Sequence, residues 1–181
     1  MEIKRRYGTA EQIMAVFNPS RQSEFARYSD RCMTGEAPSL TRFSIAYGSK
    51  PAVSWLAIQL AAVGEYAGNK EKQSIEQLAE TAEVLLTEFG YLKLTEFMLF
   101  FHKLKAGHYG SFYGAVDGIK IGEAMLEFIK WRRCELCRID REAEQRRRAE
   151  AEERDKKNCI SYETYKIMKE YEAGWLLNMG Y

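Results

Sequence analysis

Residues 52–66 read AVSWLAIQLAAVGEY, and this stretch decides the fold. Large apolar side chains are spread around the whole circumference of a helix at Trp55, Leu56, Ile58, Leu60 and Val63. A helix that is apolar on every side lies inside a protein, with other elements packed around it. We therefore expect a central helix at this position.

The flanking segments carry the signals that start and end further helices. N-cap residues and apolar side chains at three- and four-residue spacing predict helices over residues 11–17, 21–33, 39–47, 74–90 and 95–106. The N-cap candidates are Thr9, Ser39, Ser74 and Thr95, and Gln77 completes a capping box with Ser74. No run of alternating apolar and polar residues indicates a strand. The sequence thus predicts an all-α fold, a compact multi-helix bundle.

A long helix is expected from residue 119, because neither proline nor glycine occurs between residues 123 and 162. Its first part has an apolar side, whereas after Ile139 charged residues of both signs alternate. Glu142 with Arg146, and Glu150 with Arg154, are spaced to pair one turn apart, as on a solvated helix. The sequence therefore predicts a long charged helix.

A last helix is expected after Ser161. Its apolar residues are predicted to form a stripe on one face: Tyr162, Tyr165, Met168 and Tyr171, followed by Trp175. With the charged helix it predicts a C-terminal helical hairpin, an arm over residues 136–181 beside a helical bundle domain over residues 1–135. Three interpretations of the stripe stay open. It folds back onto the bundle, it pairs with a second chain in a homo-oligomer, or, as the lesser option, it is a detachable helix that binds a partner.

Composition excludes several classes of protein. With 46% hydrophobic and 29% charged residues, the chain of 181 residues has the composition of an ordinary globular protein. The net charge of +1 gives no general attraction to nucleic acid or to an anionic membrane, so such binding needs a local basic patch. Neither a signal peptide nor a membrane-spanning segment is apparent. We expect a cytoplasmic protein that does not bind membranes.

Residues 94–117, LTEFMLFFHKLKAGHYGSFYGAVD, depart most from the composition of an ordinary helical domain. They hold both histidines of the chain, His102 and His108, and a glycine turn over residues 107–114 that is rich in aromatic side chains. The turn lacks the preceding strand and the spacing of a dinucleotide fingerprint, and it has no Walker lysine. Ser111 does not stand in a G-x-S-x-G elbow either. No catalytic residue is therefore assigned.

Three interpretations of the glycine turn stay open. In the first, the glycines supply the positive φ angles of a tight turn between two packed helices, and the aromatic residues plug the end of the bundle. In the second, lysine and histidine side chains contact the phosphates of a nucleic acid while an exposed tyrosine stacks on a base. In the third, the same side chains bind a protein partner. The candidate binding residues are Lys103, Lys105, His108, Tyr109, Tyr113 and Lys120.

Cys134 and Cys137 have C-x-x-C spacing, which places both sulfur atoms on one face of a helix. A metal site needs two further ligands, which the chain offers only at distant positions. A redox motif of this kind opens a helix after a strand, whereas this one falls within a helix. We expect two small packing residues, with no metal and no cofactor.

The arginines of the long helix, Arg132-Arg133 and residues 146–148, are interleaved with glutamates and indicate a solvated helix face. Carboxylate pairs elsewhere in the chain have no accompanying pocket signature. We therefore expect a protein that is not an enzyme.

Residues 92–132 read LKLTEFMLFFHKLKAGHYGSFYGAVDGIKIGEAMLEFIKWR. This run resembles a family of uncharacterised proteins from Bacteroidetes genomes, often encoded near mobile or phage-derived genes. The resemblance covers most of residues 38–133, and its most specific part is the glycine turn with Tyr109, Gly110, Tyr113, Gly114 and Asp117. It implies a helical fold and a mobile-element setting, transfers no catalytic residue, and leaves the arm after about residue 140 outside.

Residue chemistry and this resemblance predict a non-enzymatic accessory protein of a mobile element. It is expected to bind DNA, or a nucleoprotein partner such as a replication or recombination protein, through the glycine turn and nearby lysines. The alternative is a protein-interaction or oligomerisation module that uses the long charged helix and the C-terminal Tyr/Trp stripe. A third class, a metal- or redox-linked enzyme, would use Cys134 and Cys137.

Overall fold

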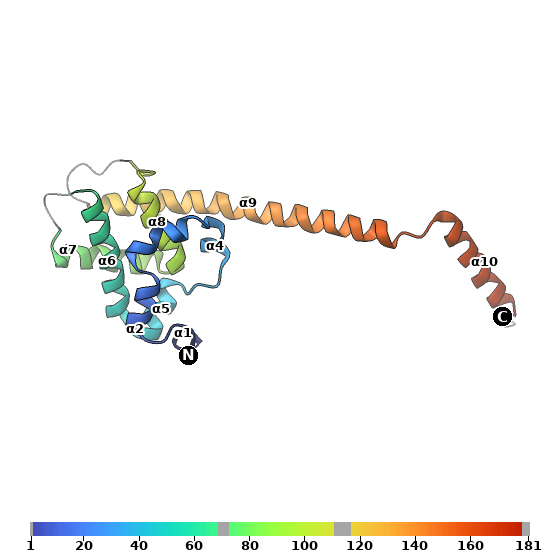
Figure 1. The fold of residues 1–181 in the computed structure, drawn as a ribbon, viewed down its shortest axis with the longest axis horizontal. Coiled ribbons are helices and arrows are strands. Elements are labelled where there is room, and N and C mark those ends of the chain that lie inside the picture. The colour runs from blue at the N-terminus through green and yellow to red at the C-terminus, as the bar shows by residue number, and fades with distance from the viewer. Residues whose placement is uncertain (1, 69–72, 111–116, 179–181) are drawn as a thin grey trace. The chain divides into compact units, whose positions relative to one another are not determined.

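The computed structural model describes residues 2–68, 73–110 and 117–178, with side chains up to residue 172. Within these ranges every regular element is a helix, and one isolated bridge joins Ser39 and Lys93. The expected all-α fold is confirmed. The elements, shown in Figure 1, are α1 (Glu2–Tyr7), α2 (Ala10–Val16), η1 (Pro19–Arg21), α3 (Gln22–Ala26), α4 (Ser29–Thr34), α5 (Leu40–Tyr47), α6 (Ser49–Tyr66), α7 (Ile75–Phe89), α8 (Leu94–Lys105), α9 (Gly118–Asn158) and α10 (Tyr162–Asn178).

The chain divides into two compact units, Met1–Cys137 and Arg138–Tyr181. In the first unit α6 packs against α5, α7 and α8, and Trp55, Leu56 and Leu60 are buried. The expected central position of α6 is confirmed, although Ile58 is 47% exposed and one side of the helix meets solvent. The expected division into a bundle domain over residues 1–135 and an arm over residues 136–181 stays a prediction.

The helix α8 is buried nearly all round. Phe100 shows how it is held, because its ring contacts Phe101 within α8 and Phe128 of α9, with ring centroids 5.2 and 5.6 Å apart. The buried residues of α8 are Leu94, Glu96, Phe97, Met98, Leu99, Phe100, Phe101 and Leu104. All of them are apolar except Glu96, whose side chain is fully buried.

Local capping signals decide where several helices begin. Ser74 Oγ accepts a hydrogen bond from the Gln77 amide at 3.2 Å, and Gln77 Oε1 accepts one from the Ser74 amide at 3.0 Å. Thr9 and Ser39 cap α2 and α5 in the same way, through their hydroxyl oxygens. These three predicted N-caps are confirmed. They could be predicted because each interaction lies within four residues of chain.

Two expectations about helix ends are wrong. Thr95 does not cap α8, which begins at Leu94, because the Thr95 hydroxyl donates instead to the Cys32 carbonyl oxygen at 2.7 Å. The single helix expected over residues 21–33 is divided into η1, α3 and α4, with Tyr28 in a non-helical conformation. Both short helices α3 and α4 contact α8, so packing against α8 bends the chain where the local pattern favours a continuous helix.

A short paired segment fixes the start of α8 against the start of α5. The Leu40 amide donates to Leu92 O and the Leu94 amide donates to Pro38 O, each at 2.9 Å. Nearby, the Thr41 amide donates to Gly90 O at 2.8 Å. A Cβ atom on Gly90 would lie 2.5 Å from Thr41 Oγ1 and 2.4 Å from Leu86 O, so only glycine permits this close approach.

In the second unit the charged part of α9 carries side-chain ion pairs. Arg138 pairs with Glu142 at 2.8 Å, and Glu144 pairs with both Arg147 and Arg148 at 3.0 Å. The predicted ion pair between the Glu142 and Arg146 side chains is wrong, because Arg146 donates to the backbone carbonyl oxygen of Glu142 instead. The solvated character of this part of the helix is as expected.

The apolar residues of α10 do not share one face. Three residues advance a helix by about 300°, so each step of the series Tyr162, Tyr165, Met168, Tyr171 falls about 60° short of a full turn. Tyr171 therefore lies across the helix from Tyr162, and the one-faced stripe expected from the sequence is wrong. All four side chains are between 48% and 80% exposed. The hairpin with α9 stays a prediction.

The close approach at Gly90 gives a stability prediction. Gly90→Ala should lower the free energy of unfolding by about 1–3 kcal/mol, because the new methyl group must push Thr41 and the end of α7 apart. Chemical unfolding followed by circular dichroism measures the change. Gly64→Ala is the control, since nothing lies within 4 Å of its Cβ position, and alanine inside α6 should add about 0.5–1 kcal/mol. Equal effects of the two variants would contradict the packing described for Gly90.

Candidate functional site

The C-terminal end of α8 gathers four basic side chains, His102, Lys103, Lys105 and His108, which we call the basic end of α8. The first three belong to the last turn of the helix. His108 follows in a turn that its amide closes by donating to Lys103 O at 3.1 Å. Gly107 permits this turn, because its φ of 79° lies in the left-handed region that side-chain-bearing residues avoid.

These basic groups influence one another's ionisation. The pKa of His102 is lowered, and partial burial is the largest cause. The nearby positive charges of His108, Lys103 and Lys105 lower this pKa further. Partial burial also lowers the pKa of both lysines, while Glu135 and Glu65 act in the opposite direction on Lys103 and Lys105. Within the described part of the chain no carboxylate forms an ion pair with any of the four. The basic end of α8 is thus a region of positive potential.

Aromatic rings support the lysines of this region. Lys103 Nζ lies 4.0 Å from the centroid of the Trp131 ring of α9, a cation–π contact. Lys105 Nζ lies 5.8 Å from the ring centroid of Tyr66, at the end of α6, and Tyr66 is 68% exposed. The alkyl stems are therefore held against the protein while the positive heads stay near its surface.

Tyr109 is a half-buried residue that packs with the core. Its ring stacks on Phe100, with centroids 5.9 Å apart, and one ring face is thereby occupied. Burial raises the pKa of its hydroxyl, and the Glu127 carboxylate raises it further, so the phenol stays neutral. This agrees with the interpretation in which aromatic residues of the glycine turn plug the end of the bundle.

The predicted binding residues fall into three groups. Lys103, Lys105, His108 and Tyr109 are brought together at the end of α8. Lys120 is exposed on the first turn of α9. Tyr113 lies outside the described residues, as does the second half of the glycine turn. The predicted set did not include His102 and Tyr66. The position of His102 one turn before the end of the predicted helix could have identified it, whereas only the tertiary fold brings Tyr66 to Lys105.

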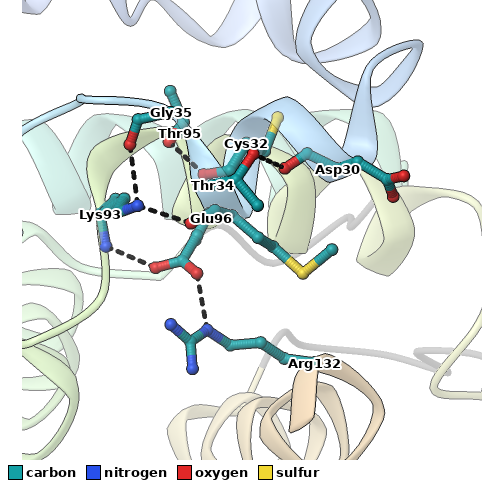
Figure 2. A network of polar contacts seen from close by, with 9 residues as sticks. Asp30, Cys32, Thr34, Gly35, Lys93, Thr95, Glu96 and Arg132 are labelled. Atoms are coloured by element: carbon teal, nitrogen blue, oxygen red, sulfur yellow. Dashed lines mark hydrogen bonds and ion pairs between the residues drawn. The ribbon is translucent and has the colours of Figure 1, made fainter. Parts of the chain in front are cut away.

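A second polar centre lies at the other end of α8, around the fully buried carboxylate of Glu96 (Figure 2). Glu96 Oε2 accepts a hydrogen bond from the Lys93 amide at 2.8 Å, which caps the start of α8. Glu96 Oε1 forms an ion pair with Arg132 Nε of α9 at 2.6 Å. Both carboxylate oxygens thus have a donor, as a buried charge requires.

The same centre holds the end of α4. Lys93 Nζ donates to the carbonyl oxygens of Met33 and Gly35 at 2.5 and 2.8 Å, and Thr95 donates to that of Cys32 (Figure 2). These carbonyls lie at the helix C-terminus, where intrahelical partners are missing and a positive charge is favourable. Burial, and then the Glu96 charge, raise the pKa of the Cys32 thiol to about 11. Cys32 is therefore a protonated core residue rather than a nucleophile.

The structure corrects two expectations about α9. Arg132, expected on a solvated face, has a side chain that is 23% exposed and paired with Glu96. Cys134 and Cys137, expected as packing residues, are both exposed. In the described residues no group of three or more His, Cys, Asp or Glu side chains is placed to hold a metal ion.

The fold and these two polar centres define a small helical protein in which α8, a helix buried along most of its length, is held at its start by Glu96 and is basic at its end. Residues 72–173, more than half of the chain, match a family described as "Family of unknown function (DUF6633)". The chain belongs to this family. No curated protein and no solved structure matches it.

The family match covers the C-terminal part of the chain. It contains α7, α8, α9 and the start of α10, and so includes both the basic end of α8 and the Glu96–Arg132 pair. The resemblance described from the sequence ended near residue 133, and the family region corrects this by continuing to residue 173. Among the described residues, no helix has the length and apolar character needed to cross a membrane.

Breaking the buried ion pair should destabilise the fold. Arg132→Met keeps much of the side-chain volume but leaves Glu96 buried without a cation, so we expect a loss of about 3 kcal/mol in the free energy of unfolding. Urea unfolding measures this loss, and Glu96→Met/Arg132→Met should recover part of it. The control is Arg147→Met, which breaks an exposed pair and should cost about 0–1 kcal/mol. Similar losses in the two single variants would show that Glu96 does not need Arg132.

Proposed function

We propose that this protein binds nucleic acid, alone or together with a protein partner, through the basic end of α8. The observation that carries the proposal is the clustering of Lys103, Lys105 and two histidines, His102 and His108, at the C-terminal end of α8. Repulsion among like charges costs free energy in the unbound protein, and a bound phosphate relieves it. Among the described residues these cations form no ion pair with a carboxylate, so the cluster is suited to an anionic ligand.

The aromatic contacts support the same proposal. Tyr66 offers an exposed ring beside Lys105, which is the combination of stacking surface and cation used on single-stranded nucleic acid. Lys120 of α9 is exposed and adds a further positive charge on the chain that follows the glycine turn. Tyr113 keeps the role expected for it from the sequence, a ring for stacking, as part of the proposal.

A simpler role for these residues must be weighed against binding. Positive side chains in the last turn of a helix interact favourably with the negative end of its dipole, by about 0.3–1 kcal/mol each. This accounts for the presence of Lys103 and Lys105 but not for His108, which follows the helix, or for the exposed ring of Tyr66. The nucleic-acid hypothesis accounts for all four.

The wider setting belongs to the same proposal. The sequence resemblance to proteins encoded near mobile or phage-derived genes favours a non-enzymatic accessory protein, acting with a replication or recombination protein in the cytoplasm. A second candidate function is self-assembly through α10. The observation that favours it is the exposure of Tyr162, Tyr165, Met168 and Tyr171 together on one helix.

Binding to labelled single- and double-stranded DNA tests the first function. Lys103→Gln/Lys105→Gln removes two charges but keeps most of each stem, so affinity at low salt should fall about tenfold and the salt dependence should become shallower. Fluorescence anisotropy across a salt series measures both. Lys4→Gln/Lys50→Gln is the control: it removes two exposed charges elsewhere, including a lysine that contacts the Tyr47 ring. Absence of binding by the wild-type protein at low salt would rule out this function.

Light scattering tests the second function. If α10 assembles copies, the wild-type chain should be a multimer, and Tyr165→Glu should shift it towards monomer by placing a charge in the apolar contact. Thr164→Glu adds the same charge at the neighbouring polar position and should leave the multimer intact. A monomeric wild-type protein at high concentration would exclude self-assembly.

A further inference from the structure

A cavity of about 340 Å³ lies between α1, α5 and the segment after α4, and it is lined by three cationic side chains. Arg6 comes from α1, Arg42 from α5, and Lys93 from the residue that precedes α8. Its volume is at the lower end of the range for small-molecule sites. None of these three residues belongs to the basic end of α8.

Lys93 is held in place by the protein. Its Nζ atom donates two hydrogen bonds, to the carbonyl oxygens of Met33 and Gly35. An ammonium group has three hydrogens, so one donor remains for a ligand. Lys93 therefore offers a positioned charge on the cavity wall and needs little further ordering to bind an anion.

Arg6 and Arg42 have only loosely held partners. Arg6 Nη1 lies 3.3 Å from Glu36 Oε2, and Arg42 Nη2 lies 3.7 Å from Glu2 Oε2. Both glutamate side chains are almost fully exposed, at 88% and 87%. Exposed pairs of this kind contribute little, and each guanidinium keeps further N–H groups free of a carboxylate. Either glutamate can swing into solvent and leave its arginine to another anion.

The rest of the cavity wall is less polar. Ile3 and Tyr7 of α1 line it together with Ala37 and Pro38, which precede α5. Apolar side chains beside one positioned cation and two further cations suit a small organic anion. Arginine in particular suits phosphate, because its planar donor groups match two phosphate oxygens at once.

We propose that this cavity binds a small phosphate-bearing ligand, with the phosphate between Arg6, Arg42 and Lys93 and the organic part against Ile3, Tyr7 and Pro38. The ligand displaces the carboxylates of Glu2 and Glu36 from the two arginines. Two sources share this chemistry, a free mononucleotide and the 5′-phosphorylated end of a nucleic acid. The site is separate from the basic end of α8 and stands whether or not that surface binds nucleic acid.

Isothermal titration calorimetry on the full chain tests the proposal with sodium pyrophosphate, adenosine 5′-monophosphate and adenosine. The two phosphate compounds should bind and adenosine should not. Arg6→Gln/Arg42→Gln should weaken binding by about tenfold or more. Glu36→Gln should tighten it, because it removes the competing carboxylate. Arg5→Gln/Arg27→Gln is the matched control, which removes two exposed guanidinium groups that do not line the cavity.

Each outcome has a defined meaning. Absence of binding by both phosphate compounds, or equal weakening in the control variant, overturns the proposal, and so does weaker binding in Glu36→Gln. Lys103→Gln/Lys105→Gln should leave phosphate binding unchanged, so this test and the DNA test fail independently. A 5′-phosphorylated trinucleotide that binds more tightly than the mononucleotide identifies a nucleic-acid end as the source. The opposite order identifies a free nucleotide.

Discussion

A carboxylate that is removed from water must be given hydrogen-bond donors, and the way Glu96 obtains them organises much of the first unit. One donor is the Lys93 amide, which places the carboxylate at the start of α8, and the other is Arg132, which ties α9 to the same point. The side chain of Lys93 in turn holds the end of α4. One buried charge thus connects three helices that are far apart in the sequence.

The two ends of α8 consequently differ in character. At its start, the positive groups of Lys93 and Arg132 interact with backbone carbonyl oxygens and with Glu96, respectively. At its end, several basic side chains lie close together, and the two lysines contact the aromatic rings of Trp131 and Tyr66. The polar interactions that stabilise the fold lie at the start of α8, and the cluster of basic side chains lies at its end. This arrangement suits a binding surface.

Interactions between residues close together in the sequence could be predicted from it, whereas interactions between distant residues could not. The capping box of Ser74 and Gln77 spans three residues, and the sequence predicted it together with the helix it starts. Arg132 could not be placed, because its partner is 36 residues away and its neighbours suggest a solvated face. The break at Tyr28 and the contact of Tyr66 with Lys105 likewise depend on tertiary packing. At the candidate site the sequence therefore identified the lysines but not the rings beside them.

The contacts between Lys93, Thr95 and the end of α4 are made only to backbone oxygens, those of Cys32, Met33 and Gly35. Every amino acid carries such an oxygen, so these contacts depend on the path of the chain and not on which side chains it bears. A substitution at the end of α4 therefore keeps these contacts as long as the chain keeps its path. Glu96 and Arg132, in contrast, recognise each other's side chains and can be replaced only as a pair.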